Sequence, residues 1–394
     1  TNRIKLFKNE TFSGSADQIE KEPTKDEIIG FSGALDRRPQ KFGSWFPNAV
    51  KIPGARYNAE TKISILLFYC YVEDLWSSAH QQKAINLSIE KGGSLNLGGR
   101  LRIAKEGFNA TLSGTYFGVR KFSEALVAFD EKSFGQTDFK FMDNLAVDKA
   151  FKDFNVFPVT ELVCYGIDEK VTMELPKGGV HLTPEEYHKK LEDEDTVVID
   201  IRNKYESDIG HFEPPGAKLI DPEMRVSTDF PSWLNLEATR KRLEGKDVMM
   251  YCTGGIRCER ASALLMKEFG DSVNGVFQLK GGIESYLKTF PGGGYWSGKN
   301  FTFDKRNAIG SYKQNSGKNS KVLGHCCICG SEWDKYEGRR KCAACAVPLL
   351  LCNSCLSKKE DKDPKNASNI RCPLCKKEGV LEKRKGHKAK QRDF

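Results

Sequence analysis

The sequence predicts an α/β domain with a mostly parallel sheet, preceded by an α+β domain and followed by a small cysteine-rich module. Strand and helix patterns alternate from about residue 180 to residue 305, as in a parallel sheet with helices on both faces. From residue 61 to 168 the apolar segments follow the order strand, helix, two strands, helix, strand. Four Cys-x-x-Cys pairs lie in the last 70 residues.

The composition fits a multidomain protein. The chain has 394 residues, 39% of them hydrophobic and 29% charged, so it can bury two ordinary cores and a smaller module. It has no window of about 18 apolar residues, so we expect no membrane span. Because eight of the 13 cysteines cluster in Cys-x-x-Cys pairs, they indicate metal and a reducing compartment. We therefore expect an intracellular, cytoplasmic protein, with a nuclear or organellar location left open.

The elements of the first domain follow a polar segment. Residues 1–60 carry scattered Gly, Pro and charge, and we expect a loosely structured extension there. In the domain over 61–168 we expect an apolar strand at 62–72 and a helix at 73–93 that stops at Gly92. Two strands around a turn at Gly107 are expected within 99–115, an amphipathic helix at 116–134 and a last strand at 138–142. This order predicts a ferredoxin-like, split βαβ fold.

The domain over 178–310 opens with a helix that Thr183 caps and Pro184 starts. Strands are expected at 197–201, 247–252 and 273–279, and helices at 233–245, 259–270 and 281–290. Sites in open parallel sheets form outside the carboxyl ends of the strands. The strand over 247–252 ends in Cys252, so this cysteine lies at such an edge.

The loop after this strand has the features of a reactive thiolate. Cys252 precedes a helix N-terminus, where unpaired backbone N–H groups and the helix dipole stabilise S⁻ over S–H. Arg257 adds positive charge, and both are predicted to be catalytic. The alternative is a buried, inert cysteine. Two glycines leave the rim of the loop without side chains, which favours the reactive interpretation. The predicted active-site loop is completed by Thr253, Gly254, Gly255, Ile256 and Cys258.

The spacing of this loop carries a family resemblance. The sequence Cys-x-x-Gly-x-Arg is one residue shorter than the loop of cysteine phosphatases and suits a sulfur atom better than a phosphoryl group. It resembles the rhodanese family of sulfurtransferases, whose nucleophilic cysteine carries a persulfide. The stretch TVVIDIRNKYESDIGHFEPPGA at 196–217 is similar to a second rhodanese motif, in which a strand ends in Asp-x-Arg and an acidic residue, Gly-His and Gly-Ala follow. The matching residues are Asp200, Arg202, Glu206, Gly210, His211, Gly216 and Ala217, with an extra Glu-Pro-Pro before the last glycine.

A closer resemblance joins several segments. YCTGGIRCER at 251–260, GRLRIAKEGFNATLSGT at 99–115 and NFTFDKR at 300–306 resemble the tRNA uridine hydroxylase branch of rhodanese-like proteins. The resemblance implies an acylphosphatase-like, ferredoxin-like domain before the rhodanese domain. It also implies oxygen-dependent hydroxylation of the tRNA wobble uridine at carbon-5, with Cys252 as the catalytic cysteine and tRNA as the partner.

Two other functions stay open. A persulfide on Cys252 would make the protein a sulfurtransferase that acts on a thiol or an RNA base. A cysteine-rich module beside a folded domain could instead make a protein-interaction or ubiquitin-ligase-like adaptor. Cys258 could resolve an oxidised Cys252 by forming a disulfide with it, or could simply pack at the start of the helix.

The module over 321–378 is predicted to hold two structural zinc ions. Its pairs supply eight thiolates, the number that two closed tetrahedral sites need. Successive and interleaved pairing are both open. The predicted metal ligands are Cys326, Cys329, Cys342, Cys345, Cys352, Cys355, Cys372 and Cys375.

Basic segments supply candidate contacts to RNA. The end of the chain, including the basic tail over 379–394, carries positive charge that attracts phosphate backbones. The alternative is a solvated tail that contacts no RNA. Arg100, Arg102 and Lys105, on a strand expected in the first domain, are weaker candidates, since scattered surface charge is normal in proteins.

Overall fold

The structure is a computed structural model that describes residues 28–29, 40–41, 48–54, 56–173, 175, 177–301, 309–310, 321–336, 340–360 and 370–380. The chain forms two compact units, Thr1–Leu162 and Val163–Phe394. Among the described helices, none combines the length and the apolar composition that crossing a membrane would require.

The first unit is built on a sheet with the strand order β2-β3-β9-β6-β7-β5-β8. Its strands are β2 (Gln40–Lys41), β3 (Val50–Pro53), β5 (Ile63–Tyr71), β6 (Gly98–Ala104), β7 (Gly107–Gly114), β8 (Lys140–Leu145) and β9 (Asp153–Pro158). The order β8-β5-β7-β6, antiparallel throughout, is the ferredoxin-like arrangement. The predicted fold class of this domain is confirmed.

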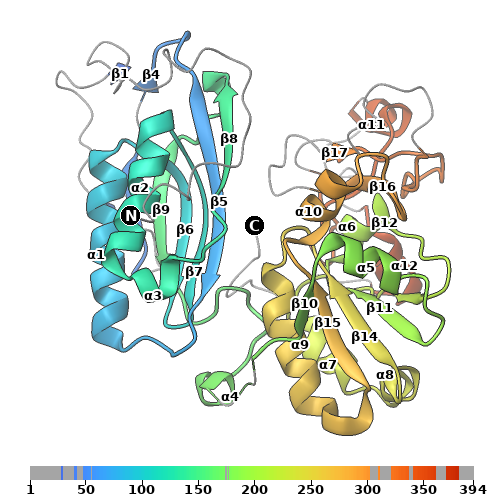
Figure 1. Ribbon diagram of the computed structural model, residues 1–394. Coiled ribbons are helices and arrows are strands. Elements are labelled where there is room, and N and C mark those ends of the chain that lie inside the picture. The colour runs from blue at the N-terminus through green and yellow to red at the C-terminus, as the bar shows by residue number, and fades with distance from the viewer. Residues whose placement is uncertain are drawn as a thin grey trace. The chain divides into compact units, whose positions relative to one another are not determined.

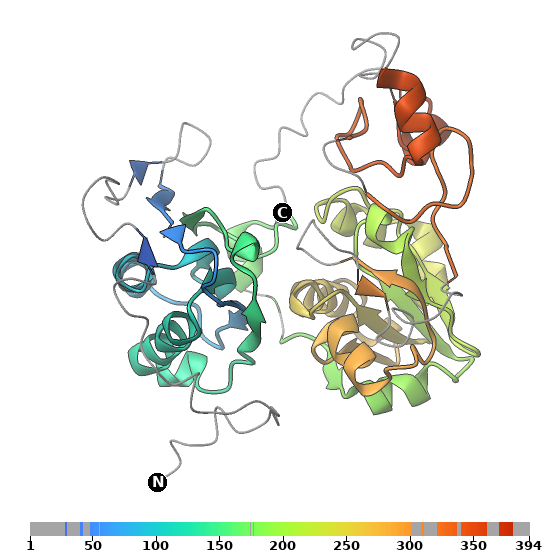
Figure 2. The ribbon, with the colours of Figure 1, turned by 90° about the horizontal axis from the view of Figure 1, so that it is seen from above.

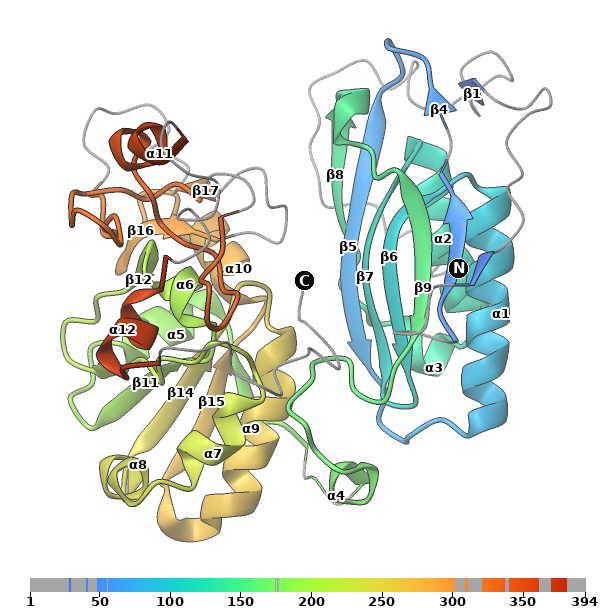
Figure 3. The same ribbon diagram turned by 180° about the vertical axis from the view of Figure 1, so that it is seen from behind.

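Helices cover one face of this sheet (Figures 1 and 3). They are α1 (Ser78–Ser94), α2 (Tyr116–Phe129) and α3 (Glu131–Phe134), and a 3₁₀ turn, η3 (Val147–Lys149), precedes β9. The core between sheet and helices contains Leu66, Leu101 and Phe108, all without exposed surface. Alternate residues on β6, including Arg100 and Arg102, point to the other face and are half-buried.

The sheet begins earlier in the chain than residue 61. β3 pairs antiparallel with β9, and Ala49 and Ile52 are 2% exposed, so this segment belongs to the core. The expectation of a loose extension through residue 60 is therefore wrong for β3. A short apolar strand in a polar segment has too little periodicity to be detected from sequence. β1 (Ile28–Ile29) also pairs with β4 (Arg56–Tyr57), and most of residues 1–47 lie outside the described part of the chain.

Two helices of this unit differ from the predicted ranges because of their caps. The helix expected from residue 73 begins at Ser78, since the Ser77 side chain accepts a hydrogen bond from the His80 backbone N–H. The helix expected over 116–134 is broken at Asp130. This residue has non-helical backbone angles (φ −151°, ψ 87°), and its carboxylate caps α3 by accepting a hydrogen bond from the Ser133 N–H.

The second unit contains a parallel sheet with the order β10-β15-β14-β11-β13. Its strands are β10 (Val180–Leu182), β11 (Thr196–Asp200), β13 (Lys218–Ile220), β14 (Asp247–Tyr251) and β15 (Gly275–Leu279). A smaller antiparallel sheet joins β12 (Gly210–Phe212), β16 (Trp296–Asn300) and β17 (Ile309–Gly310). The predicted α/β fold class with a parallel sheet is confirmed.

Both faces of the parallel sheet are covered, and Figure 2 shows its strands between helices. Val198, Met249 and Tyr251 pack into one core with side chains of α5 and α10. Their neighbours along the strands, such as Val248 and Met250, point the opposite way and are also buried. The helices are α4 (Glu169–Met173), α5 (Pro184–Lys190), α6 (Lys204–Ser207), α7 (Asp229–Leu234), α8 (Glu237–Leu243), α9 (Ile256–Phe269) and α10 (Gly282–Thr289), with a 3₁₀ turn η4 (Gly270–Ser272).

The predicted start of α5 is confirmed. Thr183 and Glu186 form a reciprocal capping box, and Pro184 is the first helical residue. The single helix expected over 233–245 is wrong, because α7 and α8 are separate helices. Leu236 between them has extended angles (φ −69°, ψ 134°), so the backbone hydrogen bonds of one helix cannot continue into the next.

The cysteine-rich module completes the second unit. It includes α11 (Asn353–Glu360) and α12 (Pro373–Lys377), and its small core consists mainly of cysteines with Leu349, Leu351 and Leu374. Lys377 pairs with Glu223 at 3.1 Å, so α12 lies against the parallel-sheet domain (Figure 3).

Candidate functional site

Cys252 lies directly after β14, and a helix follows the loop as predicted, but α9 begins at Ile256, three residues before the expected start at residue 259. Thr253, Gly254 and Gly255 form the connecting loop, and Ile256, Arg257 and Cys258 form the first turn of α9. The Gly255 N–H donates a hydrogen bond to Cys252 Sγ at 3.1 Å. Gly255 has a φ of 101°, a left-handed conformation that favours glycine, and this aims its N–H at the sulfur.

The sulfur is more enclosed than the sequence suggests. Cys252 has no exposed surface, and Thr253 is 1% exposed. A side chain at Gly254 would meet no atom within 4 Å, so the rim of the loop is open at this residue. A substrate therefore reaches Sγ only when the loop or a neighbouring segment moves.

The environment of Cys252 lowers its pKa to about 6 although burial acts in the opposite direction. The thiol of Cys258 donates a hydrogen bond to the sulfur, Arg257 contributes positive charge, and the backbone N–H groups of Arg257 and Gly255 also donate. The pKa of Cys258 is raised in turn, by burial and by its hydrogen bond to Cys252. Cys258 therefore remains a thiol while Cys252 is a thiolate near neutral pH.

Arg257 is held by a buried carboxylate. Its Nη1 and Nη2 atoms donate to the two oxygens of Glu206 at 2.9 Å and 2.7 Å, and Nη2 also lies 3.3 Å from Thr253 Oγ1. Glu206 lies in α6, far from the loop in sequence. It matches the acidic position of the second rhodanese motif, but sequence reasoning did not include it among the site residues. Only the fold shows that it fixes the catalytic arginine candidate.

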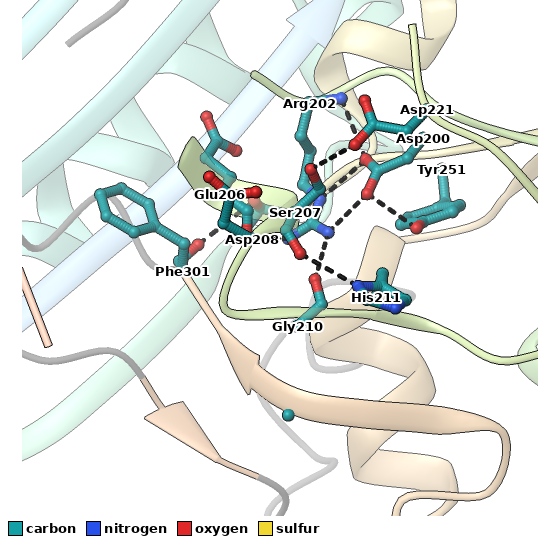
Figure 4. A network of polar contacts seen from close by, with 12 residues as sticks. Asp200, Arg202, Glu206, Ser207, Asp208, Gly210, His211, Asp221, Tyr251 and Phe301 are labelled. Carbon is teal, nitrogen blue, oxygen red and sulfur yellow. Dashed lines mark hydrogen bonds and ion pairs between the residues drawn. The ribbon is translucent and has the colours of Figure 1, made fainter. Parts of the chain in front are cut away.

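A second buried ion pair supports α6. Asp200, at the end of β11, accepts two hydrogen bonds from the Arg202 guanidinium at 2.9 Å and 2.6 Å and one from the Tyr251 hydroxyl at 2.7 Å (Figure 4). Arg202 also donates to the backbone carbonyls of Glu206 and Gly210. The Asp-x-Arg motif therefore ties β11 and β14 to the segment that carries Glu206.

The N-terminus of α10 holds the loop from the other side. The N–H groups of Ile283 and Glu284 donate to the carbonyls of Cys252 and Thr253 at 3.0 Å and 3.1 Å. Gly282 has a φ of 66°, and a Cβ there would lie 2.5 Å to 2.7 Å from loop backbone atoms. Glycine is thus required for this close approach.

The cysteine pairs meet in an interleaved pattern. Among the described residues, the first and third pairs form one cluster and the second and fourth pairs form another, with the Sγ atoms of each cluster within 4.8 Å of one another. Each cluster can hold a metal ion, which decides between the two pairings that the sequence left open. The clusters are Cys326, Cys329, Cys352 and Cys355, and Cys342, Cys345, Cys372 and Cys375.

The RNA-contact candidates are only partly described. Arg102 donates to the Leu162 carbonyl at 3.2 Å, and it lies with Arg100 on the sheet face that the helices leave open. The basic tail over 379–394 lies almost wholly outside the described residues.

Family models match three consecutive parts of the chain. The UPF0176 acylphosphatase like domain matches residues 63–161, the rhodanese-like domain matches 183–289, and the rhodanase C-terminal model matches 297–376. The Cys252 loop lies within the rhodanese-like match.

Named proteins are similar to the chain over most of its length. A tRNA uridine(34) hydroxylase of Enterococcus faecalis is 37% identical over 309 residues, which cover 77% of this chain and 87% of that protein. The chain belongs to the tRNA uridine(34) hydroxylase family. A Staphylococcus haemolyticus member is 38% identical over 248 residues, covering 62% of this chain and 71% of that protein.

A plant protein that is similar to this chain is longer than the chain. Rhodanese-like domain-containing protein 6 of Arabidopsis thaliana is 34% identical over 341 residues, which cover 82% of this chain. The chain matches 54% of the length of that relative. In this chain, the segment that matches the rhodanase C-terminal model includes all eight cysteines of the two clusters.

Proposed function

We propose that this protein is a cysteine enzyme that hydroxylates carbon-5 of the wobble uridine in tRNA. The observation that carries the proposal is the Cys252 thiolate, stabilised by Gly255, Cys258 and Arg257 in the loop of a tRNA uridine(34) hydroxylase family member. The relatives from Enterococcus and Staphylococcus bear that activity in their names, which makes tRNA the substrate we infer.

The chemistry begins with a covalent bond between sulfur and the base. The Cys252 thiolate adds to carbon-6 of uracil, and the electron pair of the C5–C6 double bond moves to carbon-5 as an enolate. Carbon-5 then takes one oxygen atom from an activated species made from dioxygen and a two-electron reductant, and the other oxygen atom leaves as water. Loss of the carbon-5 proton and cleavage of the S–C6 bond restore the double bond and the thiolate.

The protein contributes the nucleophile and its charge environment. A thiolate with a pKa of about 6 is mostly ionised at neutral pH, so no separate base is needed for the first step. Arg257 and the loop N–H groups, held in place by Glu206 and by α10, would stabilise negative charge as it develops.

The test is the nucleoside content of tRNA. In cells that lack this protein, we expect mass spectrometry to show loss of 5-hydroxyuridine and its derivatives at the wobble position. The wild-type protein and the Cys164→Ser control should restore them, whereas Cys252→Ser should not. Unaltered wobble uridines in the deletion strain would contradict the proposal.

Sulfur transfer is the second candidate, because the match to the rhodanese-like domain includes the Cys252 loop. In this reaction the thiolate takes a sulfur atom from a donor such as thiosulfate and passes it to a nucleophilic acceptor. A thiosulfate-to-cyanide assay separates the two reactions. Turnover comparable to that of a sulfurtransferase, with unaltered wobble uridines in the deletion strain, would favour the second candidate.

We propose Zn²⁺ for both cysteine clusters. Four thiolates in each cluster make the closed tetrahedral donor set of a structural zinc site, which leaves no position for substrate. The small apolar core of the module also fits a fold that depends on metal. Metal analysis of the purified protein should give two zinc ions per chain.

A further inference from the structure

Tyr336 lies in the cysteine-rich module, between the cysteines of the two clusters in sequence, yet it binds the parallel-sheet domain. Its hydroxyl donates a hydrogen bond to the backbone carbonyl of Tyr205 at 2.6 Å. Tyr205 is in α6, a helix of only four residues, so its carbonyl belongs to the last turn and needs a hydrogen-bond donor from outside the helix. The module supplies that donor.

The ring of Tyr336 also packs against the active-site domain. Tyr205, Phe301 and Tyr336, here called the aromatic trio, make three edge-to-face contacts with ring centroids 5.3 Å, 5.7 Å and 6.2 Å apart. Phe301 follows β16, and its carbonyl accepts from the Thr253 hydroxyl at 3.4 Å. The trio therefore touches both α6 and the segment that contacts the Cys252 loop.

The residue after Tyr205 connects this contact to the thiolate. Glu206 holds both Nη atoms of Arg257, and the charge of Arg257 lowers the pKa of Cys252. A displacement of α6 moves Glu206, and Arg257 follows because its two hydrogen bonds to that carboxylate are short and shielded from water. The ionisable groups beside Cys252 are Cys258 and Arg257. Those beside Tyr336 are Tyr205, Glu206, Asp208 and Cys327.

We propose that Tyr336 is a positioning residue for the Cys252 site and that, through it, the cysteine-rich module completes the active site of the parallel-sheet domain. The inference rests on the proposed role of Cys252 as a thiolate nucleophile. It assigns the module a task beyond its own folding: to fix α6, and with α6 the Glu206–Arg257 pair, against the loop.

The experiment measures alkylation of Cys252 by iodoacetamide as a function of pH in the full chain, with the modified peptide quantified by mass spectrometry. The midpoint of the pH profile reports ionisation of the thiol, whereas the plateau rate also reports access to it. Tyr336→Phe keeps the ring and removes only the hydroxyl. Lys321→Met is the matched control, because it removes an exposed ion pair with Glu213 that does not involve α6.

We expect the midpoint of Tyr336→Phe to rise by at least about 0.5 pH unit, or about threefold in ionisation, because a loosened site returns toward the ordinary thiol pKa. Lys321→Met should match the wild type, and both variants should keep the wild-type metal content. An unchanged midpoint in Tyr336→Phe with its metal retained would overturn the inference.

A second variant covers the case in which Tyr336→Phe loses metal. Phe301→Leu disrupts the aromatic trio from the other side and should also raise the midpoint with metal retained; an unchanged midpoint there overturns the inference. Failure of the proposed function has a different signature. A raised midpoint in Tyr336→Phe together with unaltered wobble uridines in the deletion strain would reject hydroxylation and leave the role of Tyr336 intact.

Discussion

Arg257 and Glu206 form a two-point ion pair, 2.9 Å and 2.7 Å between donor and acceptor atoms, in which the side chains are 3% and 1% exposed. The pair joins α9 to α6, two elements about 50 residues apart in the chain. A buried charge is stable only with its partner, so each residue depends on the other. The arginine predicted to stabilise negative charge is therefore also part of the structural core of the site.

Removing one partner should destabilise the fold. Glu206→Gln leaves the guanidinium of Arg257 buried without its counter-charge, and we expect a loss of about 3 kcal/mol in the free energy of unfolding. Chemical denaturation measures this change. Glu213→Gln, which breaks the exposed pair with Lys321, should change stability by less than about 1 kcal/mol. Equal losses in the free energy of unfolding would show that the buried pair stabilises the fold no more than the exposed pair does.

Reactivity of Cys252 should depend on pH with a midpoint near 6. The pKa is lowered to about 6, so the thiolate fraction rises as the pH increases through this value, and at pH 7 there is about ten times as much thiolate as thiol. Site-resolved alkylation rates measure the profile. A midpoint near 9 would show that the loop does not stabilise the thiolate.

Cys258 should contribute to this low pKa. Cys258→Ala removes the thiol that donates to Cys252 Sγ, and we expect the alkylation midpoint to move to higher pH. Cys258→Ser keeps a hydrogen-bond donor at the same position, so its midpoint should stay closer to that of the wild type. If both variants retain the wild-type profile, the hydrogen bond has no role in ionisation.

Gly282 should be needed for the geometry of the loop. In Gly282→Ala the new methyl group would lie within 2.7 Å of loop backbone atoms at a φ of 66°, so the loop and α10 must separate. We expect a lower melting temperature and a Cys252 alkylation midpoint at higher pH, because the displaced loop stabilises the thiolate less. Gly292→Ala is the matched control, since a Cβ there meets no atom within 4 Å. A wild-type melting temperature for Gly282→Ala would contradict the close approach.

Metal binding should follow the interleaved clusters. Cys375→Ser removes one ligand of the second cluster, and we expect elemental analysis to show one zinc ion fewer per chain and proteolysis to cut the module faster. Cys327→Ser should keep the wild-type zinc content, because Cys327 belongs to neither cluster although it lies between two ligands. Loss of zinc in Cys327→Ser would require a different ligand set.

Much of the fold could be predicted from the periodicity of apolar residues in the sequence and from its turn and cap residues. The alternation around Cys252, the cap at Thr183 and the strand pair around Gly107 are local patterns, and the structure confirms the elements that they predict. β3 was missed because its pairing with β9 spans about 100 residues and its own sequence is too short to be periodic. The break at Leu236 was missed because both flanking segments favour helix.

Some features of the candidate site could likewise be predicted from the sequence, and others depend on the tertiary structure. By itself, the sequence determined that Cys252 and Arg257 lie close together where a buried strand gives way to a helix, and that eight cysteines form four Cys-x-x-Cys pairs. Only the tertiary structure decided that Glu206 holds Arg257, that the cysteine pairs interleave, and that Tyr336 contacts α6. The physical reason is that loop spacing and helix caps depend on neighbouring residues, whereas a buried charge pair or a shared metal cluster depends on which distant segments the fold brings together.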